Sequence, residues 1–76
     1  MLIPMNCEEF LNRFPAANQL NTGFGRWADE SDRVHTYYTN AAGEVAEAIY
    51  EPRTTRHTYN RVCGEPADTL KRMYGK

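Results

Sequence analysis

The chain has 76 residues, of which 41% are hydrophobic and 25% are charged, and its formal net charge is −1. Such a chain is typical of one globular domain over residues 1–76, and because a deep pocket would remove core that so small a fold needs, we expect a protein that is not an enzyme. The near-zero charge argues against a dominant phosphate-binding surface, and without a membrane-spanning run or a signal-peptide pattern at the start we expect a cytoplasmic protein.

The first predicted element is a helix over about residues 6–14. Asn6 is the expected N-cap, and Glu9 three residues later completes the N-x-x-E capping pattern. Apolar side chains recur at the spacing of one helical face, and we expect all four to be buried: Cys7, Phe10, Leu11 and Phe14. Pro15 ends the helix because the residue before a proline avoids helical angles. So short a helix needs a sheet beneath it.

The next residues predict a loop and the beginning of a sheet. Residues 15–23 form the expected loop, with Leu20 as its only large apolar anchor. The sequence FGRWA at 24–28 predicts a short strand, and the polar residues 29–32 predict a turn. Residues 33–39, RVHTYYT, predict a longer strand because they are rich in β-branched and aromatic residues.

Residues 36–50, TYYTNAAGEVAEAIY, are consistent with either a helix from residue 41 or a hairpin. A helix would place Gly43 near its start at a cost of about 1 kcal/mol, whereas in a hairpin Gly43 supplies the left-handed residue after a type I turn at Asn40. We therefore predict a hairpin with these pairs: Thr39–Val45, Tyr38–Ala46, Tyr37–Glu47, Thr36–Ala48, His35–Ile49 and Val34–Tyr50. A four-residue loop, with Val34 opposite Ile49, is the second choice because it buries Glu47.

The predicted register separates two faces of the hairpin. The face expected to be core carries no charge and consists of Val34, Thr36, Tyr38, Ala46, Ala48 and Tyr50. The face expected to point outward carries Arg33, His35, Tyr37, Thr39, Val45, Glu47, Ile49 and Glu51. Both helices are expected on the inner face. The apolar side chains of the outer face would then need a partner.

The remaining residues predict one more strand and one more helix. Residues 51–55 turn the chain, and residues 56–62, RHTYNRV, predict a strand whose register the sequence does not fix. The last helix begins at Pro66 and ends at Gly75, and its apolar stripe consists of Ala67, Leu70, Met73 and Tyr74. The predicted fold class is therefore α+β, with an N-terminal helix, an antiparallel meander of three to four strands and a C-terminal helix.

Four side chains are candidates for metal binding or nucleophilic catalysis: Cys7, His35, His57 and Cys63. They contain no C-x-x-C or H-x-x-x-H pair, and no third partner accompanies a cysteine and a histidine, so we expect no metal, no cofactor and no catalytic residue. In a reducing cytosol the two cysteines are expected to be thiols, and a Cys7–Cys63 disulfide is the alternative.

Charge is distributed unevenly along the chain. Residues 1–51 hold three basic against eight acidic residues, and residues 52–76 hold six basic against two acidic ones. If the two segments stay apart in space, the surface has two sides of opposite sign that would steer a charged partner. If they interleave, as the ends of small folds commonly do, the charges cancel, and this is the arrangement that we favour.

The stretch 51–62, EPRTTRHTYNRV, has the most unusual composition. Arginine with tyrosine is typical of protein interfaces and also suits phosphate contact with base stacking, while charge alone would protect an edge strand. We expect a binding protein that docks on and modulates or inhibits a larger protein or complex, as phage-encoded factors do; nucleic acid is the second choice, and a small enzyme or metal site the third. The expected contact residues are Tyr37, His35, Ile49, Arg53, Arg56, His57, Tyr59 and Arg61.

Overall fold

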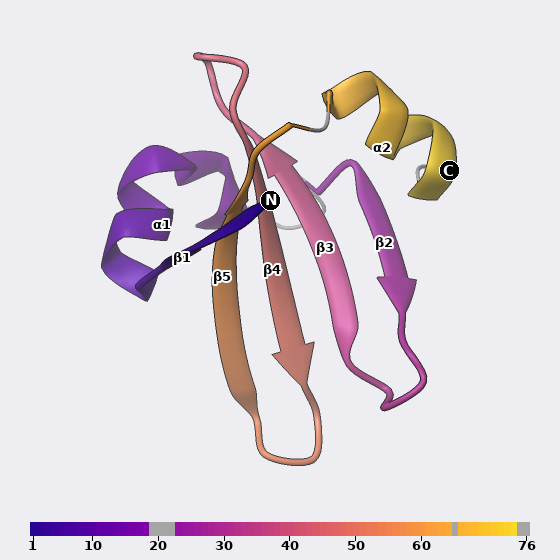
Figure 1. Cartoon of the computed structure of the whole chain (residues 1–76). Helices are drawn as coiled ribbons and strands as arrows, with labels where there is room; N and C mark the ends of the chain where they lie inside the picture. The colour runs from indigo at the N-terminus through magenta and orange to yellow at the C-terminus, as the bar shows by residue number, and fades with distance from the viewer. Residues whose placement is uncertain (19–22, 65, 75–76) are drawn as a thin grey trace.

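The computed structural model describes residues 1–18, 23–64 and 66–74, and Figure 1 shows them as one antiparallel sheet with helices beside it. The strands are β1 (Leu2–Met5), β2 (Gly25–Ala28), β3 (Val34–Thr39), β4 (Val45–Glu51) and β5 (Arg56–Val62), in the spatial order β1-β5-β4-β3-β2. The helices are α1 (Cys7–Arg13), the 3-10 helix η1 (Pro15–Asn18) and α2 (Ala67–Tyr74). The predicted α+β class is confirmed, whereas the expected anchor Leu20 and helix stop Gly75 lie outside the described residues.

The sheet has five strands, so the predicted count of three to four is wrong. The additional strand is β1, which pairs with β5 so that Ile3 lies opposite Arg61. The pairing continues one residue further, because the Met1 amino group donates to the Cys63 carbonyl at 2.8 Å. The sequence did not predict β1, because its four residues, which include Pro4, do not alternate between apolar and polar side chains. A proline is accepted here because β1 lies at the edge of the sheet.

The hairpin of β3 and β4 has the predicted register, from Thr39 opposite Val45 to Val34 opposite Tyr50. Gly43 has a φ of +78°, and its N–H donates to the Asn40 carbonyl at 3.0 Å. The Asn40 side chain closes the turn, since its Oδ1 accepts from the N–H groups of Ala42 and Glu44. The four-residue loop is therefore wrong. In the next pair of strands, Tyr50 lies opposite His57.

Helix α1 begins and ends close to the predicted residues. Asn6 Oδ1 accepts from the Glu9 N–H at 2.7 Å, which confirms the N-cap, while the Glu9 carboxylate pairs with Arg13 at 3.3 Å. Phe10 and Phe14 are buried as expected. The expected burial of Cys7 is wrong, because Cys7 lies in the first turn beside the Tyr59 hydroxyl and remains exposed. Leu11 is only half-buried.

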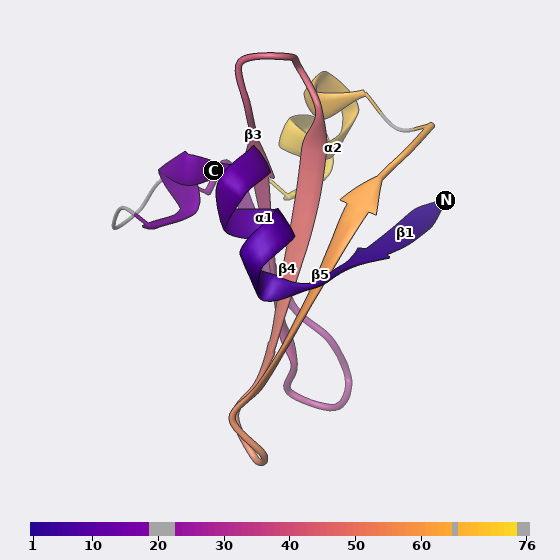
Figure 2. The ribbon, with the colours of Figure 1, turned by 90° about the vertical axis from the view of Figure 1, so that its left-hand side faces the viewer.

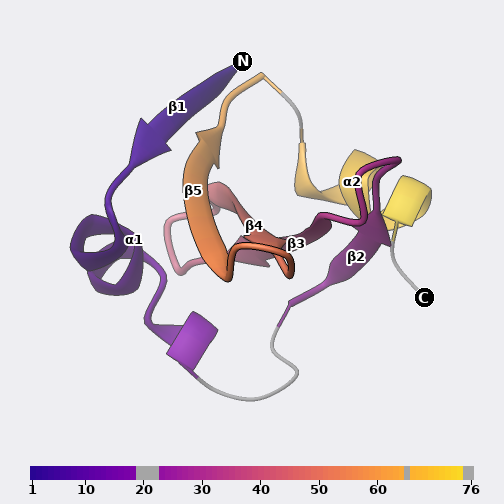
Figure 3. The ribbon, with the colours of Figure 1, turned by 90° about the horizontal axis from the view of Figure 1, so that it is seen from below.

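The two helices cover opposite faces of the sheet, so the expectation that both lie on the inner face is wrong (Figure 3). Phe10 of α1 packs on Ala46, Tyr38 and Tyr59. Helix α2 packs Leu70 and Tyr74 on the other face, against Tyr37, Val45, Trp27 and Val62. Met73, expected in its apolar stripe, is 61% exposed. A helical stripe predicts which side of a helix is buried but not which face of a sheet receives it.

Both helices lie at the same end of the sheet, next to the β3–β4 turn (Figures 1 and 2). Their contacts with the sheet include Val45 and Ala46 at the start of β4 and Val62 at the end of β5. The opposite end, with the β2–β3 and β4–β5 turns, extends beyond α1 and α2 (Figures 1 and 2). We call it the bare end and define it as residues 29–33 and 50–58.

Candidate interaction surface

The bare end presents a continuous exposed segment. All residues from 52 to 58 are exposed, which includes the whole β4–β5 turn and the first three residues of β5. The Arg53 side chain is 79% exposed and has one ionic contact, at 4.0 Å to the Asp32 carboxylate of the β2–β3 turn. An ion pair this long and this exposed contributes little to stability, so Arg53 is available to a partner.

An aromatic pair lies at the foot of this segment. Tyr50 on β4 and His57 on β5 face each other across the two strands, with ring centroids 4.8 Å apart. The pair lies on the face that carries α1, but the helix contacts the sheet nearer the β3–β4 turn, around Tyr59 and Ala48. Tyr50 is half-buried and His57 is exposed. A large ring supported on one side and open to water on the other is what an interface anchor requires.

The structure brings together only part of the expected contact residues. Arg53, Arg56 and His57 lie in the bare end, and Ile49, which is half-buried, pairs with exposed Thr58 at its upper limit. Tyr59 is half-buried beneath α1, with its ring 4.5 Å from Phe10. Arg61 lies at the other end of β5, where it pairs with the Glu44 carboxylate at 3.4 Å.

Two of the expected contact residues are buried, so the expectation that they stand out on the surface is wrong. Tyr37 is 4% exposed and His35 is 8% exposed. Tyr74 of α2 stacks on Tyr37, and Trp27 of β2 stacks on His35 at 4.0 Å. These contacts arise because α2 and β2 cover the face that the hairpin pattern alone leaves open. Tyr37 therefore belongs to the core beneath α2, and His35 is buried beside it under Trp27.

Tyr50 also lies in the bare end, although the sequence pattern predicted it in the core. Its position on the uncharged face of the hairpin was predicted correctly, and the register with β3 confirms it. That pattern does not show how far α1 extends along the sheet, and α1 is too short to cover Tyr50 near the end of β4. A helix of seven residues spans about 10 Å, whereas the seven residues of β4 span about 24 Å. That difference in length was the available signal.

The two oppositely charged segments of the chain interleave at the surface, as favoured above. Arg53 pairs with Asp32, and Arg61 pairs with Glu44, which also contacts Arg13 at 3.6 Å. The Asn40 side chain lowers the pKa of Glu44, and the two arginines add to the effect. At the bare end, the acidic β2–β3 turn thus lies beside the arginines of the β4–β5 turn.

Asp29 organises the β2–β3 turn of the bare end. Its Oδ1 accepts from the N–H groups of Ser31 and Arg33, at 2.8 and 3.0 Å, and its Oδ2 contacts the Arg33 guanidinium at 3.0 Å. The hydrogen bond from His35 contributes most to lowering the pKa of Asp29, which falls to about 2. Asp29 is therefore ionised at neutral pH and holds the turn in one conformation.

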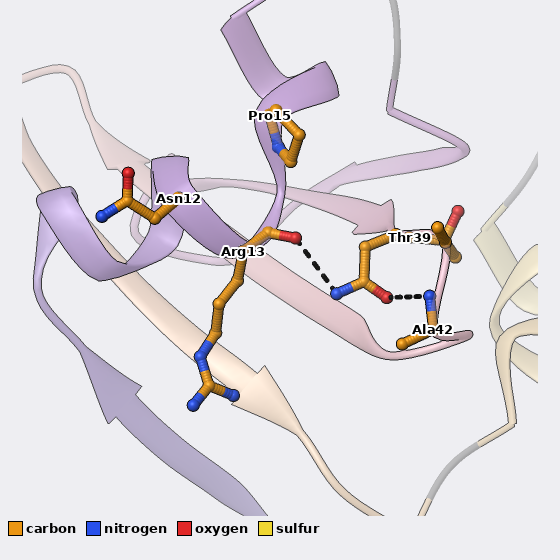
Figure 4. A pocket seen from close by; sticks show the side chains of 7 residues that line it. Asn12, Arg13, Pro15, Thr39 and Ala42 are labelled. Atoms are coloured by element: carbon orange, nitrogen blue, oxygen red, sulfur yellow. Dashed lines mark hydrogen bonds between the residues drawn. The ribbon is translucent and has the colours of Figure 1, made fainter.

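A shallow depression of about 430 Å³ lies at the end opposite the bare end, between α1, η1 and the β3–β4 turn (Figure 4). Its one charged side chain, Arg13, already pairs with Glu9 and Glu44. Asn40 donates to the Arg13 carbonyl at 3.1 Å, so its amide serves the fold. The depression offers an open surface with no acid, base or nucleophile among its lining residues, and we assign it no chemistry.

The remaining chemical candidates can be placed as well. Cys7 and Cys63 are both thiols, so the alternative disulfide is not formed. Within the described ranges, no three His, Cys, Asp or Glu side chains are grouped so as to hold a metal ion. None of the helices in the described part of the chain has the length and apolar character needed to cross a membrane.

No family model, no curated protein and no solved structure matches this chain.

Proposed function

We propose that the protein is a non-enzymatic binding module that docks on a larger protein or complex through the bare end and modulates it. The observation that carries this proposal is that α1 and α2 cover the same end of the sheet, so that Tyr50, His57 and residues 52–58 remain uncovered by either helix. A fold with both helices at one end leaves the other end of the sheet, where β4 and β5 remain paired, open to a partner.

The chemistry of the bare end fits a protein partner. Tyrosine and arginine are the residue types most enriched among interface hot spots, and the bare end combines Tyr50 with Arg53 and Arg56. The aromatic pair would form the centre of the contact and the arginines its rim, which is the usual anatomy of an interface. Because Tyr50 and His57 lie on paired strands, little conformational entropy is lost on binding.

A nucleic acid is the second candidate partner, because Arg53, Arg56 and His57 are exposed beside an aromatic ring. The acidic β2–β3 turn argues against it: Asp32 contacts Arg53, and with Asp29 and Glu30 of the same turn it would repel phosphates. The two partners differ in salt dependence. Binding to nucleic acid weakens steeply as salt rises, whereas contact through an aromatic centre responds weakly.

The proposal is tested by photo-crosslinking in the native cell. A photoreactive amino acid at Thr54, in the bare end, should capture one partner repeatedly, and the same amino acid at Asn12, on exposed α1, should not. Tyr50→Ala should then weaken binding of the captured partner by roughly 30-fold, the equivalent of a 2 kcal/mol hot spot. Met73→Ala on α2 is the matched control and should bind like the parent.

The outcome that contradicts the proposal is equally specific. Crosslinks at Asn12 with none at Thr54 would move the interaction to the helix-covered end. Because Tyr50→Ala also removes supported ring surface, Arg53→Ala provides a variant that leaves the fold intact, since the Arg53 side chain is 79% exposed. If both variants bind a partner as the parent does, the bare end is not the docking surface.

A further inference from the structure

A cluster of polar side chains is buried on the face that α2 covers, next to the β2–β3 turn of the bare end. His35 on β3 and Glu47 on β4 are 8% and 5% exposed. Their neighbours are Trp27, which stacks flat on the imidazole with 9° between the rings, and Tyr37, whose hydroxyl accepts from Trp27 Nε1 at 3.0 Å. Buried polar atoms are nearly always hydrogen-bonded, so each atom of this cluster should have a partner.

The chemistry of its neighbour determines whether one ring nitrogen of His35, Nε2, carries a hydrogen. Its Nε2 lies 2.9 Å from Asp29 Oδ2. Asp29 is ionised independently of His35, because its carboxylate accepts from the N–H groups of Ser31 and Arg33 and from the Arg33 guanidinium. An ionised carboxylate only accepts hydrogen bonds, so Nε2 must carry a hydrogen. In a neutral imidazole, Nδ1 then carries a lone pair and no hydrogen.

The other ring nitrogen faces a second acceptor. His35 Nδ1 lies 3.4 Å from Glu47 Oε2, is buried and has no hydrogen-bond partner. If the ring is neutral and Glu47 is ionised, two lone pairs meet in a site shielded from water, which is unfavourable. A single hydrogen between the two atoms turns this contact into a hydrogen bond, whichever of them carries it.

We propose that His35 and Glu47 together bind one proton from solvent, and that this proton joins β3 to β4 beneath Trp27. The proton resides on Nδ1, as an imidazolium between two carboxylates, or on Glu47, as a carboxylic acid that donates to Nδ1. Because one hydrogen between the two atoms serves both, the proton belongs to the pair rather than to either residue. The structure thereby acquires a pH-dependent contact between β3 and β4.

The groups around the pair are consistent with one bound proton. From β2 and its turn come Trp27 and the Asp29 carboxylate, and from β3 comes Arg33, which contacts Asp29. The Tyr37 hydroxyl, also on β3, stays protonated because burial raises its pKa to about 12, and its hydrogen bond to Glu47 adds to the rise. Helix α2 contributes Tyr74, which stacks on Trp27, and β5 contributes the neutral Asn60 opposite Glu47.

Charge balance supports the same count. Asp29 and Glu47 supply two negative charges, and Arg33 supplies one positive charge. One proton on the pair makes the cluster neutral, which is the state that a buried site favours. Loss of the proton would leave a net negative charge and two opposed lone pairs under Trp27, and should loosen the packing of Trp27 against Tyr74.

The single tryptophan makes the proposal measurable. Trp27 is the only tryptophan of the chain and stacks on His35, and a protonated imidazole quenches indole fluorescence on contact. The emission of the folded parent protein should therefore change in one step as pH is varied, either because an imidazolium quenches the indole or because loss of the proton from the pair loosens the packing of Trp27. Glu47→Gln supplies a permanent N–H to Nδ1 and should move this step to lower pH by about one unit or more, the worth of one hydrogen bond.

Two further variants provide the controls. His35→Gln should abolish the step, and His57→Gln, which changes the only other histidine at the exposed bare end, should leave it unchanged. A step that survives His35→Gln, or that stays at the parent's pH in Glu47→Gln, overturns the proposal. So does an emission that does not vary with pH while the protein remains folded.

If Glu47→Gln does not fold, the parent protein alone decides the question. Nuclear magnetic resonance of the imidazole ¹⁵N and the Glu47 carboxyl ¹³C reports both members of the pair without a substitution. The proposal expects their signals to titrate together, at the same pH as the Trp27 emission. Signals that titrate independently, or a Glu47 carboxylate that stays ionised while Nδ1 stays bare, overturn it.

Discussion

Single side chains decide where the elements of this protein begin and turn, and asparagine does so twice. Asn6 caps α1 through its bond to the Glu9 N–H, and Asn40 closes the β3–β4 turn through two N–H groups. Both roles were predictable from the sequence, because a short polar side chain competes effectively for backbone groups at such positions. The burial of His35 and Glu47 was not predictable, because the hairpin pattern does not reveal that Trp27 of β2 and helix α2 cover that face.

The N-cap gives the first prediction. Asn6→Ala should lower the free energy of unfolding by about 0.5–2 kcal/mol, because the Glu9 N–H loses its acceptor at the start of α1. Asn6→Asp should keep nearly the full stability, since a carboxylate also accepts that bond and lies at the favourable end of the helix dipole. Urea unfolding followed by circular dichroism measures both. An alanine variant as stable as the parent would show that the cap does not stabilise α1.

Asp29 gives the second prediction, on acid stability. Its folded pKa of about 2 lies below the usual value of 3.8 for an aspartate, so its contribution to stability is fully present above about pH 4 and is lost as pH falls toward 2. Asp29→Asn should flatten the fall of the unfolding free energy between pH 4 and pH 2. Asp32→Asn removes one exposed negative charge from the same turn and leaves the side-chain bonds of Asp29 in place, so it serves as the charge-matched control. Equal slopes for the parent and Asp29→Asn would contradict the prediction.

At the scale of elements, the β3–β4 hairpin was predictable in full and its surroundings were not. The turn residues Asn40 and Gly43 determine the loop length, and the loop length determines every pair from Thr39–Val45 to Val34–Tyr50. Nothing comparable marks β1, whose pairing with β5 depends on backbone groups that no side-chain pattern reveals. The position of α2 was equally hidden, so Tyr37 was expected on the surface when it is core.

The hairpin turn gives the third prediction. Gly43 has a φ of +78°, and an added Cβ would meet no atom within 4 Å. A substitution there is therefore destabilising only because the new residue must adopt a left-handed backbone conformation. Gly43→Val should therefore destabilise by at least about 1–2 kcal/mol, the cost of a left-handed residue, with β-branching adding to it. Gly43→Asn should cost much less, because asparagine tolerates these angles. Thermal unfolding of the two variants checks the order, and a valine variant no less stable than the asparagine variant would contradict it.

At the scale of the whole molecule, the sheet separates two small cores. One contains Phe10, Phe14 and Ala46 beneath α1, and the other contains Tyr37, Val45 and Leu70 beneath α2. Neighbouring residues of β4 supply both cores, Ala46 to one face and Val45 to the other. Neither core is large enough to hold a fold by itself, so we expect the molecule to unfold as one cooperative unit.

This cooperativity gives the fourth prediction. Phe10→Ala should lower the unfolding free energy by about 3–5 kcal/mol, because the side chain is 3% exposed and stacks on Phe14 and Tyr59. The urea midpoint should fall equally when it is read from Trp27, which lies on the opposite face, and from circular dichroism of the whole chain. Two different midpoints would show that the cores unfold separately.

The pairing of β1 with β5 has a consequence for the kinetics of folding. Met1 and Cys63 are 62 residues apart in sequence, whereas β3, β4 and β5 are joined by short turns. Contacts between distant residues carry a larger closure entropy, so the β3–β4–β5 meander should form first and β1 should join after the transition state. Ile3→Ala should then speed unfolding and leave the folding rate unchanged, while Ala46→Gly in the central strand slows folding. Stopped-flow mixing in urea measures both rates, and a slower folding rate for Ile3→Ala would place β1 in the nucleus instead.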